Sequence, residues 1–170
     1  MIVRHKAGAE VEFGNTLLLT EQGDGLIVDW ELFRNPAPAD ARRLKQSQGR
    51  LKERLGIDVH LVAADRGFDS EANRAYLEKE NTFNAVCPRN PQQLQQRLQE
   101  EAFLDAQNHR SQTEARISIL GRCFCGNPMK QKSYAYRNLH MGLSILTHNL
   151  WVLARLKMAQ AQELRSDQAA

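Results

Sequence analysis

The chain has 170 residues and a mass of 19.4 kDa, enough to bury the core of one domain. Its 42% hydrophobic and 25% charged residues are ordinary for a globular protein, and a net charge of +3 permits a polyanionic partner without requiring one. Three cysteines without zinc-ligand spacing, no signal peptide and no apolar run of about 18 residues lead us to expect a reduced, cytoplasmic protein that does not span a membrane.

The first third of the chain has the patterns of a β-hairpin. Residues 9–19 predict one strand, and the turn-forming sequence at 22–25 separates it from a second strand over 26–33. In this second strand the apolar side chains at 26, 28, 30 and 32 share one face, while Asp29 and Glu31 lie on the other. That alternation predicts a half-buried strand.

A βαβ pattern follows the hairpin. Leucines at 44, 51 and 55 mark one face of a helix predicted over 40–55, which Gly56 ends. Residues 58–64 are apolar on both faces, as in a central or parallel strand. Ser70 is predicted to cap a short helix through Leu77, and residues 83–87 form a last strand before Pro88.

The second half is predicted to be helical. Residues 91–107 hold six glutamines and predict a polar helix, more typical of an insertion or lid than of a core. A second helix is expected over 110–123, with a packed face made by Thr113, Ile117, Leu120 and Phe124. A long helix over 132–163 has large apolar residues at spacings of three and four: Tyr136, Leu139, Leu143, Leu146, Leu150 and Leu153. Residues 165–170 are expected to be a flexible tail.

Two carboxylates and one arginine are the candidate site residues. Asp65 follows the 58–64 strand, where open α/β sheets place ligand-binding groups. Glu114 lies in a helix with Arg110 four residues earlier on the same face. Two converging carboxylates suit Mg²⁺, and paired ions activate a nucleophile for phosphoryl displacement. By spacing alone, a turn acid at Asp65 and a helix-surface ion pair at Glu114 are the better interpretations.

Four segments, in this order, resemble a known family. They are Lys6-Ala7-Gly8-Ala9-Glu10-Val11-Glu12-Phe13-Gly14-Asn15, Ala64-Asp65-Arg66-Gly67-Phe68, the run Arg110-x3-Glu114-Ala115-Arg116-Ile117-Ser118, and His148-Asn149-Leu150. Together they resemble the carboxy-terminal catalytic region of bacterial insertion-sequence DDE transposases, over about residues 4 to 156. The resemblance implies an α/β, RNase H-like fold with a mixed sheet, flanking helices and a long C-terminal helix.

The resemblance also implies a function. Asp65 would be the second and Glu114 the third acid of a triad that binds Mg²⁺, with Mn²⁺ as a possible substitute, and Arg110 would orient Glu114 or touch a phosphate. The intact enzyme would hydrolyse a phosphodiester at the transposon end and use the freed 3′-hydroxyl to attack target DNA. Residues 1–164 would be part of this catalytic domain. The implied partners are DNA and an intact transposase, in a homo-oligomer.

Several positions depart from the family pattern. The family's first aspartate lies on a strand before the Lys-Ala-Gly segment, and we expect that strand to be absent or a stub here. The family's tyrosine falls on Gln107, and its lysine falls on Gly121, beside Arg122. We therefore expect a truncated copy that does not cut DNA alone. The alternative is a non-catalytic DNA-binding or dimerising remnant of a transposase.

Two further sets of residues bear on this choice. Glu12, Asp29 and Glu31 are the nearest acids that could replace the missing one. Strand spacing places Asp29 and Glu31 too far away to share a metal, and Glu12 could reach only if it lay at the right end of its strand. Basic residues outnumber acids between positions 110 and 137, which suits a phosphate backbone or, equally, a solvated surface. The predicted DNA-binding residues are Arg116, Arg122, Lys130, Lys132 and Arg137.

Overall fold

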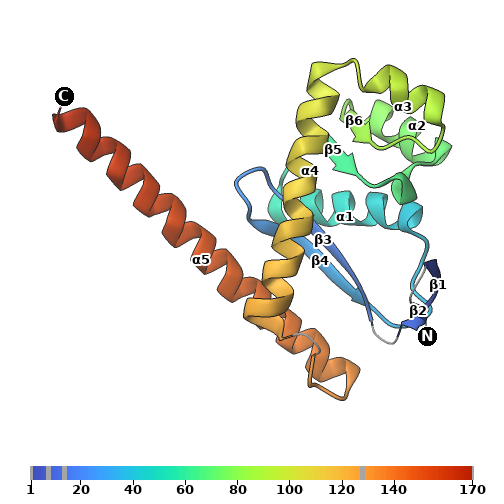
Figure 1. Cartoon of the computed structure of the whole chain (residues 1–170), viewed down its shortest axis with the longest axis horizontal. Helices are drawn as coiled ribbons and strands as arrows, with labels where there is room; N and C mark the ends of the chain where they lie inside the picture. Colours follow the sequence, from blue (N-terminus) through green and yellow to red (C-terminus); the bar gives the residue numbers. More distant parts are fainter. Residues whose placement is uncertain (1, 7–8, 13–14, 127–128, 170) are drawn as a thin grey trace. The chain divides into compact units, whose positions relative to one another are not determined.

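The computed structural model describes residues 2–6, 9–12, 15–126 and 129–169 (Figure 1), and side chains for 15–126 and 129–166. The chain divides into two compact units. The first, unit 1, comprises Met1–Thr20 and Asp29–Glu114. The second, unit 2, comprises Glu21–Val28 and Ala115–Ala170. The fold is mixed α/β, as predicted, and the long C-terminal helix is present.

The described strands form three two-stranded sheets. Strands β1 (Ile2–Lys6) and β2 (Ala9–Glu12) are antiparallel, β3 (Thr16–Glu21) pairs with β4 (Ile27–Phe33), and β5 (Leu61–Ala64) is parallel to β6 (Phe83–Val86). The single strand predicted over 9–19 is therefore wrong, because it is divided between β2 and β3. Nor do the described strands join into the one mixed sheet that the resemblance implied.

The βαβ segment of unit 1 follows the predicted order closely. Helix α1 (Asp40–Leu55) ends at Gly56, which has the left-handed φ of 63° expected of a C-terminal glycine. After the short 3₁₀ turn η1 (Arg66–Phe68), helix α2 (Glu71–Lys79) begins at Ser70, whose Oγ accepts the Asn73 backbone N–H. The predicted end of α1 at Gly56 and the predicted start of α2 at Ser70 are both confirmed. Leu55, however, is exposed and does not join the packed face.

The core of this segment lies where α1 and α2 meet β6. Leu44, Leu77 and Val86 are buried together, and Phe68 packs against them. Leu77 has no exposed surface. Because α2 connects the parallel strands β5 and β6, its packing in this cluster fixes the strand ends that carry the site.

The face of β4 that sequence alternation marked as polar is covered by α1, so that expectation is corrected. Asp29 is buried and accepts hydrogen bonds from Ser47 at 2.7 Å and from both Nε and Nη2 of Arg50. Glu31 pairs with Arg50 Nη1 at 2.7 Å. The hydrogen bonds from Arg50 to Asp29 raise the pKa of Arg50 above its ordinary value. Paired charges allow this polar face to be buried.

The helical second half is divided differently from the prediction. The 91–107 segment is two helices, α3 (Pro91–Arg97) and the start of α4, because the chain turns at Leu98–Glu100. Helix α4 (Glu101–Ile119) continues through the predicted boundary near 110 into the π-helical turn η2 (Leu120–Cys125). Phe103 is fully buried with Ala85 and Ala106, so this part of α4 belongs to the core and is not a detached lid.

Unit 2 packs one face of the 36-residue helix α5 (Tyr134–Ala169) on η2 and on the tip of the β3–β4 hairpin. Its buried residues are Met141, Ser144, Ile145, His148 and Val152. The Asn149 side chain binds both backbone polar groups of Ile27, and His148 lies edge-on to the Phe124 ring. Ile117, predicted to be packed, is 47% exposed. No helix among the described residues is long and apolar enough to cross a membrane.

Candidate functional site

Asp65 stands at the carboxyl end of β5 because the following turn is fixed on both sides. At Gly67 a Cβ atom would lie 2.6 Å from Asp40 Oδ2, so a larger residue here would require the Asp40 side chain at the start of α1 to move away. Phe68 anchors the turn by packing against the Leu44 cluster. The Asp-Arg-Gly-Phe motif therefore has a structural function, which is to place the carboxylate of Asp65.

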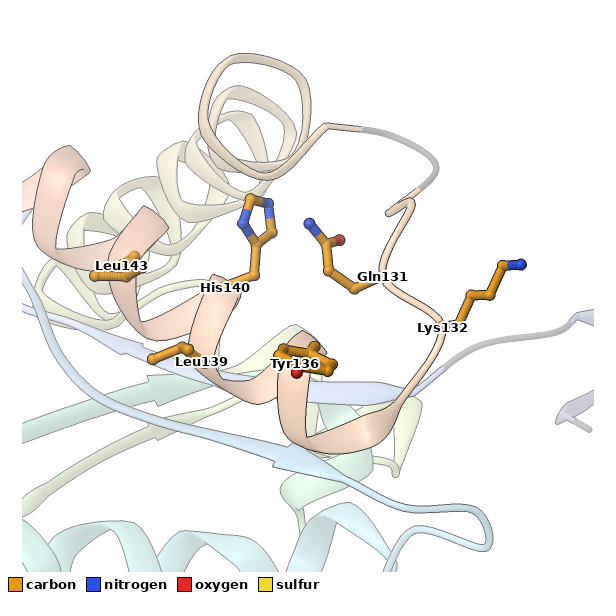
Figure 2. A pocket seen from close by; sticks show the side chains of 6 residues that line it. All are labelled: Gln131, Lys132, Tyr136, Leu139, His140 and Leu143. Atoms are coloured by element: carbon orange, nitrogen blue, oxygen red, sulfur yellow. The ribbon is translucent and has the colours of Figure 1, made fainter.

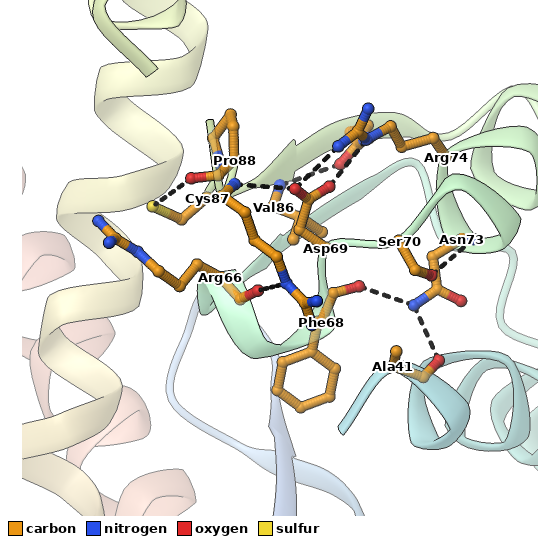
Figure 3. A network of polar contacts seen from close by, with 12 residues as sticks. Ala41, Arg66, Phe68, Asp69, Ser70, Asn73, Arg74, Val86, Cys87 and Pro88 are labelled. Carbon is orange, nitrogen blue, oxygen red and sulfur yellow. Dashed lines mark hydrogen bonds and ion pairs between the residues drawn. The ribbon is translucent and has the colours of Figure 1, made fainter. Parts of the chain in front are cut away.

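Hydrogen bonds from α2 and from the segment that follows β6 hold the same turn (Figure 3). Asp69 is buried and accepts three hydrogen bonds, two from the Arg74 guanidinium at 2.8 and 2.9 Å and one from the Arg89 backbone N–H at 2.8 Å. The Arg89 side chain donates to the carbonyls of Arg66 and Gly67. The Asn73 amide donates to the Phe68 carbonyl. Hydrogen bonding to Arg74 lowers the pKa of Asp69 below its ordinary value.

Helix α4 brings Arg110 to Asp65. Phe103 and Ala106 seat this helix against β6, which places Gln107 next to the carbonyl of Ala85. Gln107 donates its amide to that carbonyl and accepts Nε–H of Arg110 at 2.9 Å. Gln107, which stands where the family has tyrosine, therefore orients the guanidinium.

The two candidate acids share one nitrogen of that guanidinium. Arg110 Nη1 lies 2.9 Å from Asp65 Oδ1 and 3.1 Å from Glu114 Oε1. The two carboxylate oxygens therefore lie no farther apart than 2.9 Å plus 3.1 Å. The Asp65 and Glu114 side chains are 68% and 70% exposed, whereas Arg110 is only 26% exposed. The structure thus brings all three predicted residues together at the surface of unit 1.

The donor set is chemically suited to a hard cation, but both of its carboxylates are already paired with Arg110. Carboxylate oxygens are the ligands that Mg²⁺ and Mn²⁺ prefer. The described residues contain no group of three or more histidines, cysteines or acids that could hold a metal. Because Arg110 contacts both carboxylates, a cation that used the same oxygens would have to displace its guanidinium.

The acids considered as replacements lie elsewhere or outside the described side chains. Asp29 is held by Ser47 and Arg50, and Glu31 is held by Arg50. Glu12 belongs to β2, whose side chains lie outside the described part. Neither Asp29 nor Glu31 has a carboxylate free of a cationic partner.

The predicted DNA-binding residues belong to unit 2 and differ in their contacts. Arg116 forms an ion pair with Glu21, whose side chain is only 9% exposed, so this arginine has a structural role. Arg137 donates to the carbonyl of Gln131, and Arg122 makes a long contact with the Ser118 carbonyl. Lys130 and Lys132 are exposed. The lysines are therefore the members of the set best placed to contact a polyanion.

An open hollow of about 400 Å³ lies at the start of α5 (Figure 2). It is lined by Gln131, Lys132, Tyr136, Leu139, His140 and Leu143. His140 Nε2 lies 2.8 Å from the carbonyl of Cys125, which fixes its ring on one side of the hollow. The surface is mainly apolar and contains none of the candidate acids.

Sequence reasoning missed the residues that support the site. Gln107 was read only as a departure from a family pattern, although its place three residues before Arg110 puts both on one face of a helix. That spacing was a usable signal. Asp69 and Arg89 gave no such signal, because their contact joins positions twenty residues apart.

Comparison with known proteins adds no assignment. No family model, no curated protein and no solved structure matches this chain.

Proposed function

We propose that this chain belongs to the catalytic domain of a bacterial insertion-sequence DDE transposase, with Asp65 and Glu114 as two of its metal-binding acids. The observation that supports it is the convergence of these two carboxylates, from the end of β5 and from α4, on Arg110 Nη1. Segments far apart in the chain, with 45 positions between Asp65 and Arg110, thereby form one oxygen-rich surface beside a parallel strand pair.

The chemistry of this proposal follows from the residues present. Asp65 and Glu114 would hold Mg²⁺ or Mn²⁺, which when bound activates a hydroxyl and stabilises charge on phosphate oxygens. Gln107 keeps Arg110 directed at both acids. In the absence of a cation Arg110 pairs with both of them, and once displaced its guanidinium can contact a phosphate.

Mn²⁺ binding, followed by electron paramagnetic resonance, tests the proposal. We expect weak binding that Asp65→Asn abolishes and that Arg110→Ala tightens. Exposed ion pairs contribute about 0.2–1 kcal/mol each, so releasing two of them should strengthen binding by about two- to thirtyfold. Asp58→Asn is the matched control, because Asp58 is an exposed acid of the same unit. Mn²⁺ binding that survives Asp65→Asn would remove the metal site from this surface.

One observation favours a second candidate function, a non-catalytic DNA-binding or dimerising remnant. Among the described residues no third acid joins Asp65 and Glu114, and Arg110 occupies both of them. In that case the cluster is a structural ion-pair network that ties α4 to the end of β5. Arg110→Ala would then lower the stability of unit 1 without changing Mn²⁺ binding, which separates the two candidates.

A further inference from the structure

Helix α5 has two apolar faces, and only one of them is packed within unit 2. Met141, Ile145 and Val152 lie on the packed face and are buried. The other face consists of six residues that we call the leucine stripe: Tyr136, Leu139, Leu143, Leu146, Leu150 and Leu153. Each of these six is between 42% and 68% exposed. So large an apolar surface on one helix is typical of an interaction site.

The spacing of the leucine stripe indicates the shape of its partner. The intervals alternate between three and four residues from Tyr136 to Leu153, which is a 3.5-residue repeat. A helix that packs on a globular surface has a wider stripe with a period near 3.6. A narrow 3.5-residue stripe instead stays in register with a second helix that supercoils around the first. The partner is therefore another helix with the same repeat.

The residues beside the leucine stripe allow that helix to come from an identical chain. None of them is an acid, a lysine or an arginine: His140, Gly142, Thr147, Asn149 and Ala154. Coiled coils that select a different chain do so through complementary charges at these flanking positions, and like charges there repel a copy. Neither feature is present along the stripe. Two of the flanking residues, His140 and Asn149, already bind backbone groups inside unit 2.

We propose that the leucine stripe binds the same stripe of a second copy of this chain, in a two-stranded coiled coil. The stripe runs over 18 residues, or about 27 Å of helix at the usual rise of 1.5 Å per residue. The hollow in Figure 2 lies at its amino-terminal end, since Tyr136, Leu139 and Leu143 belong to both. Side chains of the second copy would fill this hollow. The interface is independent of the proposed metal chemistry.

Sedimentation velocity of the full chain over a range of concentrations tests the proposal. We expect a monomer–dimer equilibrium whose dissociation constant rises at least 100-fold in the double variant Leu143→Glu/Leu146→Glu. Both positions are exposed, so the fold of unit 2 should be retained, and circular dichroism checks this. The milder Leu150→Ala should weaken the dimer about tenfold and covers the case in which the double variant unfolds.

Met158→Glu is the matched control. Met158 is 64% exposed on the same helix but lies outside the leucine stripe, so its substitution should leave the dissociation constant unchanged. A wild-type chain that stays monomeric up to about 100 µM overturns the proposal. Its dissociation constant would then lie above that concentration, which is too weak for a specific dimer. A dimer that persists in the folded double variant overturns it as well, because the contact would then lie elsewhere.

Discussion

Asp69 shows how single side chains hold the site in place. Its carboxylate is buried and receives two hydrogen bonds from Arg74 and one from the Arg89 backbone, next to the turn that positions Asp65. The charged form is thus favoured in the folded state, which is why the pKa of Asp69 is lowered. This contribution to stability is complete above the unfolded pKa of about 3.9 and is lost as pH falls through the lower folded pKa.

We therefore expect Asp69→Asn to lower the free energy of unfolding by about 2 kcal/mol at pH 7, the usual effect of losing hydrogen bonds to a charged group. The difference between variant and wild type should narrow below about pH 4, because the wild type then loses the same interaction. Urea unfolding at pH 7 and pH 3 measures both values. Asp58→Asn, at an exposed acid, is the control. A difference that is equal at the two pH values would contradict the role given to the Asp69 charge.

The candidate site was predictable from sequence only in part. The Arg110–Glu114 pair follows from helical spacing, and Asp65 follows from its place after an apolar strand. Spacing alone favoured separate roles for the two acids, and only the resemblance brought them together. Their meeting depends on Phe103 and Ala106, which seat α4 on β6. Such packing is a tertiary property that no local pattern encodes.

At the scale of elements, Arg50 holds α1 against β4. Its side chain is 19% exposed and binds Asp29 and Glu31, and the Asp29 side chain is only 9% exposed. Arg50→Ala would leave the Asp29 charge buried with Ser47 as its remaining described partner. Removing one partner of a buried pair costs about 3–5 kcal/mol. We expect a loss near the lower end of this range, because Glu31 is more exposed.

Chemical denaturation of the whole chain, followed by tryptophan fluorescence in a Trp151→Phe background that leaves Trp30 of β4 as the reporter, measures this loss. Lys52→Ala, also on α1, removes an exposed cation and should change stability by less than about 0.5 kcal/mol. If Arg50→Ala is as mild as this control, the α1–β4 contact does not depend on the ion pairs. The contacts of Asp29 and Glu31 with Arg50 would then contribute little to the stability of unit 1.

Element ends were predicted where the signal is local. Gly56 and Ser70 end or begin helices by their own backbone and side-chain chemistry, and both were identified in the sequence. The break between α3 and α4 and the continuation of α4 past residue 110 were missed. Glutamines and leucines favour a helix throughout this region, so composition gives no boundary there. The start of α4 is set instead by a tertiary contact, the packing of Phe103 against Ala85 in the core.

At the scale of the whole molecule, strand pairing was the least predictable property. Strand order joins segments far apart in the chain, and hydrophobic alternation says nothing about which neighbour a strand will find. The described strands therefore appear as three pairs where the resemblance implied one sheet. The division into two units is equally invisible in composition, because the hairpin tip at Glu21–Val28 belongs with residues 115–170. This division also places the acids and the predicted DNA-binding residues in different units.

We expect the whole chain to bind duplex DNA weakly, without sequence preference, and through Lys130 and Lys132. Both lysines are exposed, whereas Arg116 is occupied by Glu21. Contacts to phosphates release counterions, so affinity should fall steeply with salt, with a slope of about 0.9 per contact on a double-logarithmic plot. Lys130→Glu/Lys132→Glu should weaken binding and lower the magnitude of that slope by about 1.8, the value expected when two phosphate contacts are lost. Fluorescence anisotropy with a labelled duplex at several salt concentrations measures both.

Arg54→Glu/Lys79→Glu makes the same change in net charge at exposed positions of unit 1 and is the matched control. If binding depends on Lys130 and Lys132 as a local surface, the control should keep the wild-type slope and lose little affinity. If both double variants weaken binding equally, only the overall charge matters, and the loop before α5 is not a DNA surface. Arg116→Glu should instead lower the stability of unit 2, since it opposes Glu21 with a like charge.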